Sequence, residues 1–174
     1  NDYEFLVVTH AVNDFCVVEM SNFYLDIIKD RLYCDETDGL ARRSAQTALY
    51  LILDTITKIM APILCFTGDE IWLAMPHKAG DDDRNVLFND MNGVFADYAL
   101  SADEMAKWEK IIEVRDAVNG ALETARAEKK IGKSLEADVA LTVPAEDAFL
   151  AEMDGAALAD LLIVSQVEVT VGGE

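Results

Sequence analysis

The pattern of apolar positions at the start of the sequence predicts two amphipathic helices. Apolar side chains recur at steps of three and four residues over positions 2–20, and the same spacing returns over positions 23–32. This spacing places apolar residues on one face of an α-helix. Ser21 lies between the two segments, and a serine hydroxyl readily accepts from the free amides at a helix start. We therefore expect Ser21 to cap the second helix.

Two more helices are expected to follow. Residues 40–60 form a long periodic segment, and Pro62 disfavours a helical conformation of the residue before it. Thr67 and Glu70 have the spacing of a capping box, which predicts that the next helix starts there. Four helices with short connections pack as an antiparallel bundle. The first domain is therefore predicted to be the four-helix part of a bundle, over residues 1–76.

The next part of the sequence changes character. Residues 77–100 are rich in turn-forming residues and have few periodic apolar positions, which predicts a long surface connection. Ser101 and Glu104 then form a second capping-box pattern. The helix that they open is expected to run to about residue 130 and to end at Gly132. We predict that this long helix, within residues 101–132, completes the bundle.

The apolar period switches from helical to alternating after the long helix. Alternation over residues 135–143 and again over residues 166–171 predicts two half-buried strands. Residues 146–161 between them predict one or two short helices. Residues 133–174 are thus a small α/β appendage whose strand order the pattern leaves open. The fold class predicted for the whole chain is mainly α, an antiparallel helix bundle with a small C-terminal α/β appendage.

Composition adds limits to this picture. A chain of 174 residues with 52% hydrophobic content can bury a proper core. Its apolar runs are far shorter than the ~20 residues that cross a bilayer, so we expect a soluble, cytoplasmic protein with no membrane partner. We also expect it to be a monomer. The three cysteines are widely spaced and form no C-x-x-C pair, so we expect buried free thiols.

The sequence holds no pattern that is typical of catalysis. His10 and His77 have no serine or cysteine at a recognisable nucleophile spacing. Paired acids occur at 35–36, 69–70 and 81–83, where a turn, a cap and a solvated loop explain them. We therefore predict no catalytic residue, no metal site and no cofactor within this chain.

Positive charge is concentrated in two places, although the formal net charge of -19 disfavours a polyanionic partner. Seven of the fourteen lysines and arginines lie between Lys107 and Lys133. At about 100° per residue, four polar residues of the long helix share a sector of roughly 60° beside its apolar stripe. These four are Arg115, Asn119, Arg126 and Lys130. A second basic set surrounds the turn between the second and third helices: Lys29, Arg31, Arg42 and Arg43.

Two interpretations compete for these basic residues. Cations near a helix C-terminus complement the helix dipole and pair with neighbouring acids on a solvated surface. The alternative is contact with the phosphates of a nucleic acid. Aromatic side chains could then stack on unpaired bases, and Tyr33 beside a polar turn is the best candidate. The helical spacing of Trp72 and Trp108 among Leu and Ile favours core packing for both.

Several stretches resemble one family, the anticodon-binding C-terminal region of bacterial-type isoleucyl-tRNA synthetases, which are class I enzymes. The resemblance rests on NDFC at 13–16 and SNFYLDIIKDRLY at 21–33, followed by RRSAQ at 42–46 and MAPILCFTGDEIW at 60–72. ALETAR at 121–126 and KKIGKSLEA at 129–137 are similar to the family's long helix and following strand. The family usually has proline where Cys65 stands here.

The resemblance implies a module that holds the anticodon stem and loop of isoleucine tRNA. Our hypothesis assigns Arg115, Arg126, Lys129, Lys130 and Lys133 to phosphates, with Asn119 beside them. It assigns Lys29, Arg31, Tyr33, Arg42 and Arg43 to the loop or its backbone. Part of this basic set could instead dock on the catalytic domain of the same polypeptide.

The sequence does not contain the H-I-G-H-like and K-M-S-K-S-like signatures of the family's active site. The resemblance therefore implies that ATP and Mg are bound by a catalytic domain absent here, and zinc by a cysteine-rich tail, also absent. The chain alone should be inactive. Two alternatives stay open: the corresponding domain of a valyl- or leucyl-tRNA synthetase, and a helical protein-interaction module that does not bind RNA.

Overall fold

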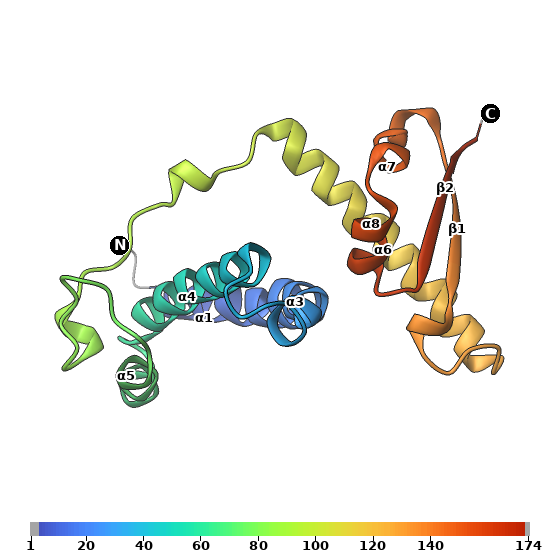
Figure 1. Cartoon of the computed structure of the whole chain (residues 1–174). Helices are drawn as coiled ribbons and strands as arrows, with labels where there is room; N and C mark the ends of the chain where they lie inside the picture. The colour runs from blue at the N-terminus through green and yellow to red at the C-terminus, as the bar shows by residue number, and fades with distance from the viewer. Residues whose placement is uncertain (1–3, 173–174) are drawn as a thin grey trace. The chain divides into compact units, whose positions relative to one another are not determined.

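The computed structural model describes residues 4–172 and divides the chain into two compact units, Asn1–Phe95 and Ala96–Glu174 (Figure 1). The first unit is helical, and the second combines a long helix with short helices and a two-stranded sheet. This confirms the prediction of a mainly α protein with a small α/β appendage. The first two residues of the expected first helix lie outside the described residues.

The first unit begins with one helix where the sequence predicted two. The helix comprises α1 (Phe5–Asp14), a π-helical segment (Phe15–Tyr24) and α2 (Leu25–Ile27), and after Ile28 the chain continues as α3 (Lys29–Tyr33). Ser21 lies inside the π-helical segment, so the prediction that it caps a helix is wrong. The apolar pattern continues on both sides of Ser21, and the backbone stays helical through this residue. The irregularity falls at Ile28, whose side chain is fully buried.

The two following helices form a close pair. Helix α4 (Leu40–Met60) packs against α5 (Cys65–Ala74). Helix α5 starts two residues before Thr67 and has no side-chain cap, so the predicted capping box is wrong. The Gly68 amide already donates to Leu64 O, at 2.8 Å. A Cβ at Gly68 would lie 3.2 Å from Ala61 Cα, so the glycine permits the close approach of α5 to the end of α4.

Part of the segment predicted as a surface connection packs onto these helices. Val86, in a 3-10 turn over Val86–Phe88, joins the core cluster of Ala61 and Trp72. The Trp72 indole Nε1 donates to Asp82 O at 3.0 Å. Part of this segment is therefore a strap that packs onto the helices, and the rest is a solvated loop.

The second unit is organised by α6 (Ala102–Ala127). The capping box of Ser101 and Glu104 is confirmed, because each side chain bonds to the other residue's backbone amide. The helix ends before the expected Lys130, because Lys129 adopts a left-handed conformation with φ of 58°. Helix α6 packs against α8. Its expected part in completing the bundle stays a prediction.

A small parallel sheet completes this unit. Strands β1 (Asp138–Val143) and β2 (Gln166–Val171) pair in parallel, and the crossover between them carries α7 (Phe149–Glu152) and α8 (Gly155–Leu162). This confirms both predicted strands, although the first starts after a 3-10 turn at Ser134–Glu136. The core contains Val118 and Leu122 of α6 and Leu158 and Leu162 of α8.

The three cysteines depart from expectation. Cys16, Cys34 and Cys65 are free thiols, as predicted, but all three are exposed, so the prediction of burial is wrong. Each lies on the solvent side of a helix or beside a helix end, which periodicity alone did not reveal. Among residues 4–172, no helix is both long enough and apolar enough to span a membrane.

Candidate nucleic-acid interface

One predicted group of contact residues lies in the helical unit, where α3 leads into α4. We call it the α3–α4 basic turn: Lys29, Arg31, Tyr33, Arg42 and Arg43. The Arg42 Nη1 donates to Asp35 O at 3.2 Å, which draws the start of α4 onto the turn that follows Tyr33. The turn therefore brings together the tyrosine and the arginines, which are separated along the chain.

The start of α4 has an unusual charge arrangement. Gly39 precedes the helix without a side-chain cap, and the first turn contains no acidic residue. Arg42 and Arg43 instead occupy the third and fourth positions of the helix. The N-terminal end of a helix carries a partial positive charge, so cations there are unfavourable unless an anion is present. Free amides and two guanidinium groups together make this end suited to a phosphate.

The remaining members of the basic turn are open to solvent. Tyr33 is 81% exposed at the end of α3, so its ring is available for stacking without any change in the fold. Lys29 Nζ lies 2.6 Å from Asp26 Oδ1, and this hydrogen bond raises the pKa of Lys29. Arg31 and Arg43 are exposed. Trp72, in contrast, is 1% exposed, which confirms its predicted place in the core. Trp108 is 37% exposed, so the prediction of core packing is wrong for this residue.

The second predicted group lies in the other unit, along and after the end of α6. We call it the α6 basic flank: Arg115, Asn119, Arg126, Lys129, Lys130 and Lys133. Arg115 departs from the exposed surface expected of it. Its side chain is buried, and its Nε donates to Leu161 O at 2.9 Å, so it joins α6 to the end of α8. Asn119 is partly buried on the same helix.

The other cations of the flank are exposed to different degrees, and two are paired with acids. Arg126 Nη1 contacts Glu123 Oε1, and its Nη2 lies 2.8 Å from Ser134 Oγ. Lys130 Nζ lies 2.7 Å from Glu128 Oε2. The helical spacing of three between Glu123 and Arg126 could have predicted their contact. A phosphate would have to replace these carboxylates.

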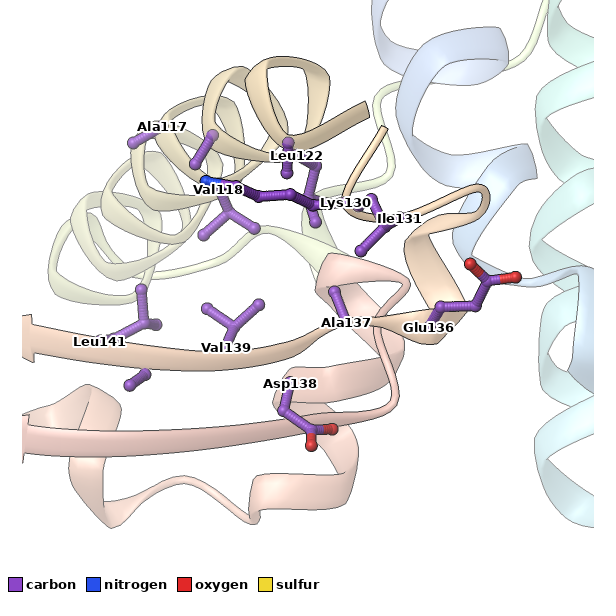
Figure 2. Close-up of a pocket in the computed structure, with 13 residues that line it drawn as sticks. Ala117, Val118, Leu122, Lys130, Ile131, Glu136, Ala137, Asp138, Val139 and Leu141 are labelled. Carbon is purple, nitrogen blue, oxygen red and sulfur yellow. The ribbon is translucent and has the colours of Figure 1, made fainter. Parts of the chain in front are cut away.

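The loop after α6 contains a further carboxylate that the sequence did not single out. Glu136 Oε2 accepts hydrogen bonds from the backbone amides of Gly132, at 2.7 Å, and Lys133, at 3.3 Å. Figure 2 shows Glu136 directed away from Val118 and Leu122, which line a groove of about 570 Å³ between α6 and β1. Lys133 and Lys129 are exposed on the same loop. The loop therefore carries several cations, and the Glu136 carboxylate holds part of its backbone.

Neither histidine belongs to a reactive cluster. The ring of His77 lies against Trp72, with centroids 4.7 Å apart, and His10 is exposed on α1. Within the part of the chain that the structure describes, no group of three or more His, Cys, Asp and Glu side chains could hold a metal ion.

Comparison with known proteins agrees with the sequence resemblance. The family model described as "Anticodon-binding domain of tRNA ligase" matches residues 1–141. The chain is 49% identical to an isoleucine–tRNA ligase of Syntrophotalea carbinolica over 168 residues, which are 96% of this chain and 18% of the relative. It is 43% identical to that of Geobacter sulfurreducens over 174 residues, 99% of this chain and 18% of the relative. An isoleucine–tRNA ligase of Coxiella burnetii is 49% identical over 139 residues, 80% of this chain and 14% of the relative.

The chain thus spans less than a fifth of the length of these curated relatives. The match nevertheless covers both units, because residues 1–141 extend from the first helix into β1. The sequence resemblance and the comparisons agree on one assignment: this chain belongs to the family of anticodon-binding domains of tRNA ligases.

Proposed function

We propose that this chain is the tRNA-binding part of an isoleucine–tRNA ligase and recognises the anticodon stem-loop of isoleucine tRNA. Aminoacylation, with its ATP and Mg, would be carried out by a catalytic domain elsewhere in the longer polypeptide. The family assignment supports tRNA binding, and the names of the relatives support isoleucine. The chain's own role would be to hold one end of the tRNA while the distant acceptor end reacts.

The observation that carries this proposal is the charge at the start of α4. Two arginines stand at a helix end that already favours anions, and no acid in the first turn neutralises them. Tyr33 is exposed at the end of α3, and Arg42 is bonded to Asp35 O in the turn that follows it. An anticodon loop offers both partners at once, since its bases are unpaired and can stack while its backbone presents phosphates. We assign the phosphates to Arg42 and Arg43, and a base to Tyr33.

The α6 basic flank would contribute a second, sequence-independent contact. Lys129 and Lys133 are exposed, and Arg126 and Lys130 could exchange their carboxylate partners for phosphates. Arg115 is left out of this contact because its side chain is buried. Phosphate contacts position an RNA without reading its sequence, so discrimination would come from the α3–α4 basic turn.

A further partner would be the remainder of the polypeptide. The first helix has no buried residue between Phe5 and Tyr24, and its exposed apolar side chains include Leu6, Val7, Val17 and Val18. A helix that is apolar on more than one face is usually buried. Because the relatives are more than five times longer than this chain, we propose that the rest of the synthetase polypeptide covers these residues. We expect the whole protein to be a monomer.

The proposal is tested by gel shift with the 174-residue chain and a panel of isoleucine, valine, leucine and serine tRNAs at several salt concentrations. Isoleucine tRNA should bind tightest, and binding of all four should weaken steeply with salt. A preference for valine or leucine tRNA would reassign the subgroup. No retention of any tRNA at low salt would favour the alternative of a protein-interaction module.

A matched pair of variants makes this test specific to the proposed site. Replacing Arg43 by Ala should weaken binding of every tRNA and reduce the slope of log K against log salt by about 0.7–0.9. Replacing Arg84 by Ala removes an equal charge from the same unit, where Arg84 is bonded to Asp82 at 2.6 Å. This control should leave the slope unchanged.

A further inference from the structure

The loop that follows α6 is closed by one carboxylate. The amides of Gly132 and Lys133 are consecutive along the backbone, and both point to Oε2 of Glu136. Successive amides of this kind form a small concave site for an anion, and here the chain fills it with its own side chain. A Cβ at Gly132 would lie 3.3 Å from that carboxylate, so the glycine permits the close approach.

Other contacts fix the two ends of the same loop. At its start Lys129 adopts a left-handed conformation, which turns the chain away from the helix axis. Near its end Ser134 Oγ accepts from Arg126 Nη2 at 2.8 Å, which ties the 3-10 turn back to α6. Between these points the Lys130 amide donates to Ala125 O at 2.9 Å and Ile131 packs against the core, and the Glu136 carboxylate holds the amides of Gly132 and Lys133.

The loop held in this way carries three of the cations assigned to phosphate contact. Lys129, Lys130 and Lys133 are all exposed, and each is attached to backbone between α6 and the 3-10 turn. Long lysine side chains lose conformational freedom when they bind, so a fixed backbone lowers the cost of presenting them together. A loose loop would present the same charges with a larger entropic cost.

We propose that Glu136 is a positioning residue, whose contact with the amides of Gly132 and Lys133 presents Lys129, Lys130 and Lys133 to the phosphates of a bound RNA. This inference rests on the proposed function, and it assigns a negatively charged side chain a favourable part in binding a polyanion. The two backbone hydrogen bonds also lower the pKa of Glu136, and the bond from the Gly132 amide has a larger effect than the bond from the Lys133 amide. The lowered pKa keeps the carboxylate ionised.

A nearby glutamate provides a control of equal charge. Glu128 is exposed and contacts Lys130 Nζ at 2.7 Å, and its carboxylate has no part in closing the loop. Removing either glutamate raises the net charge of the loop by one. Simple charge attraction therefore predicts that both removals strengthen RNA binding. The positioning role predicts effects of opposite sign, because the loss of Glu136 also frees the loop.

The experiment measures tRNA affinity and its salt dependence for the whole chain and for Glu128→Ala, Glu136→Ala and Glu136→Gln. We expect Glu128→Ala to bind about twofold more tightly, as for an exposed ion pair. Glu136→Ala should bind about fivefold more weakly, with a salt slope smaller by about 0.7–0.9 for each lost contact. Glu136→Gln keeps an oxygen acceptor and should fall between Glu136→Ala and the unsubstituted chain.

Amide hydrogen exchange at Gly132 and Lys133 provides a readout that does not involve RNA. Both amides should exchange faster in Glu136→Ala and nearly as slowly as in the unsubstituted chain in Glu136→Gln. Equal exchange in all three proteins, or tighter RNA binding by Glu136→Ala that matches Glu128→Ala, would overturn the positioning role. Failure of the unsubstituted chain to bind any tRNA would overturn the proposed function, whatever the exchange rates show about the loop.

Discussion

Asp54 and Lys58 form an ion pair in the interior of the helical unit, where Lys58 Nζ lies 3.0 Å from Asp54 Oδ1 and the side chains are 4% and 0% exposed for Lys58 and Asp54. The Nδ2 of Asn92 donates to Asp54 Oδ2 at 2.7 Å, and Lys78 Nζ lies 3.4 Å from the same oxygen. Residues far apart in the sequence thus meet on one carboxylate of α4. Through Lys78 and Asn92, this cluster holds the strap that follows α5 against α4.

Replacing Asp54 by Asn should destabilise the helical unit by about 3–5 kcal/mol, because Lys58 would keep a buried charge without its partner. Urea unfolding measures the effect through Trp72 fluorescence, in a Trp108→Phe background that leaves one tryptophan. Asp83→Asn is the matched control, since Asp83 is exposed in the same unit. Its effect should stay within about 0.5 kcal/mol, and equal stability of both variants would show that the buried pair has no net value.

Acid should weaken the same unit. Burial opposes ionisation of Asp54, but hydrogen bonds from Asn92 and Lys58 and the charges of Lys58 and Lys78 outweigh it and lower its pKa below 3.8. A carboxyl group whose pKa is lower in the folded than in the unfolded state contributes stability at pH values above its unfolded-state pKa. This contribution is lost as the pH falls through its folded-state pKa. We expect the stability difference between the unsubstituted chain and Asp54→Asn to shrink as pH falls below about 4. Urea unfolding from pH 6 to pH 2 measures it, and a constant difference would contradict the assignment.

Substitutions of Arg115 and Lys129 should distinguish a residue that stabilises the fold from a residue that contacts RNA. Arg115→Met leaves Leu161 O without its donor, which should destabilise the second unit by about 1–3 kcal/mol. Faster amide exchange at Leu158 and Leu162 of α8 would report this loss. Lys129→Met should leave that exchange unchanged and weaken tRNA binding, because Lys129 is exposed. Exchange that is unaltered by Arg115→Met would show that its bond to α8 is dispensable.

Tyr33 should contribute through its ring. Tyr33→Ala should weaken binding of an isolated anticodon stem-loop by about tenfold, because stacking on an aromatic side chain is worth roughly 1–3 kcal/mol per base. Tyr33→Phe keeps the ring and should bind nearly as well as the unsubstituted chain. Fluorescence anisotropy of a labelled stem-loop measures both. Stability should not change, since the side chain is 81% exposed, and equal affinity of the two variants would exclude a stacking role.

Much of the fold followed from local pattern. The capping box at Ser101 predicted the start of α6, and alternation of apolar residues predicted both strands. The patterns at Ser21 and Thr67 predicted helix starts that do not exist. A residue caps a helix only where the preceding backbone is not helical, and at Ser21 and Thr67 the preceding residues are already helical.

The candidate interface was predictable in part. The sequence placed Arg42 and Arg43 near a turn, but only the structure shows that α3 packs against α4 and that Arg42 bonds to Asp35 O in the turn between them. Helical geometry grouped Arg115 with Arg126, because both lie on one sector of α6. It could not show that α8 covers Arg115. The role of Glu136 was also hidden, because its partners are backbone amides, which every sequence has.

The sequence by itself determined the family, the helical class and the order of elements, because periodicity, capping signals and family motifs are properties of short stretches of chain. Tertiary structure alone decided which cations are buried and which face solvent. These outcomes depend on neighbours that are distant along the chain, as Arg115 is from Leu161. A lysine or arginine can contact an RNA only where the packing of the folded chain leaves its side chain exposed.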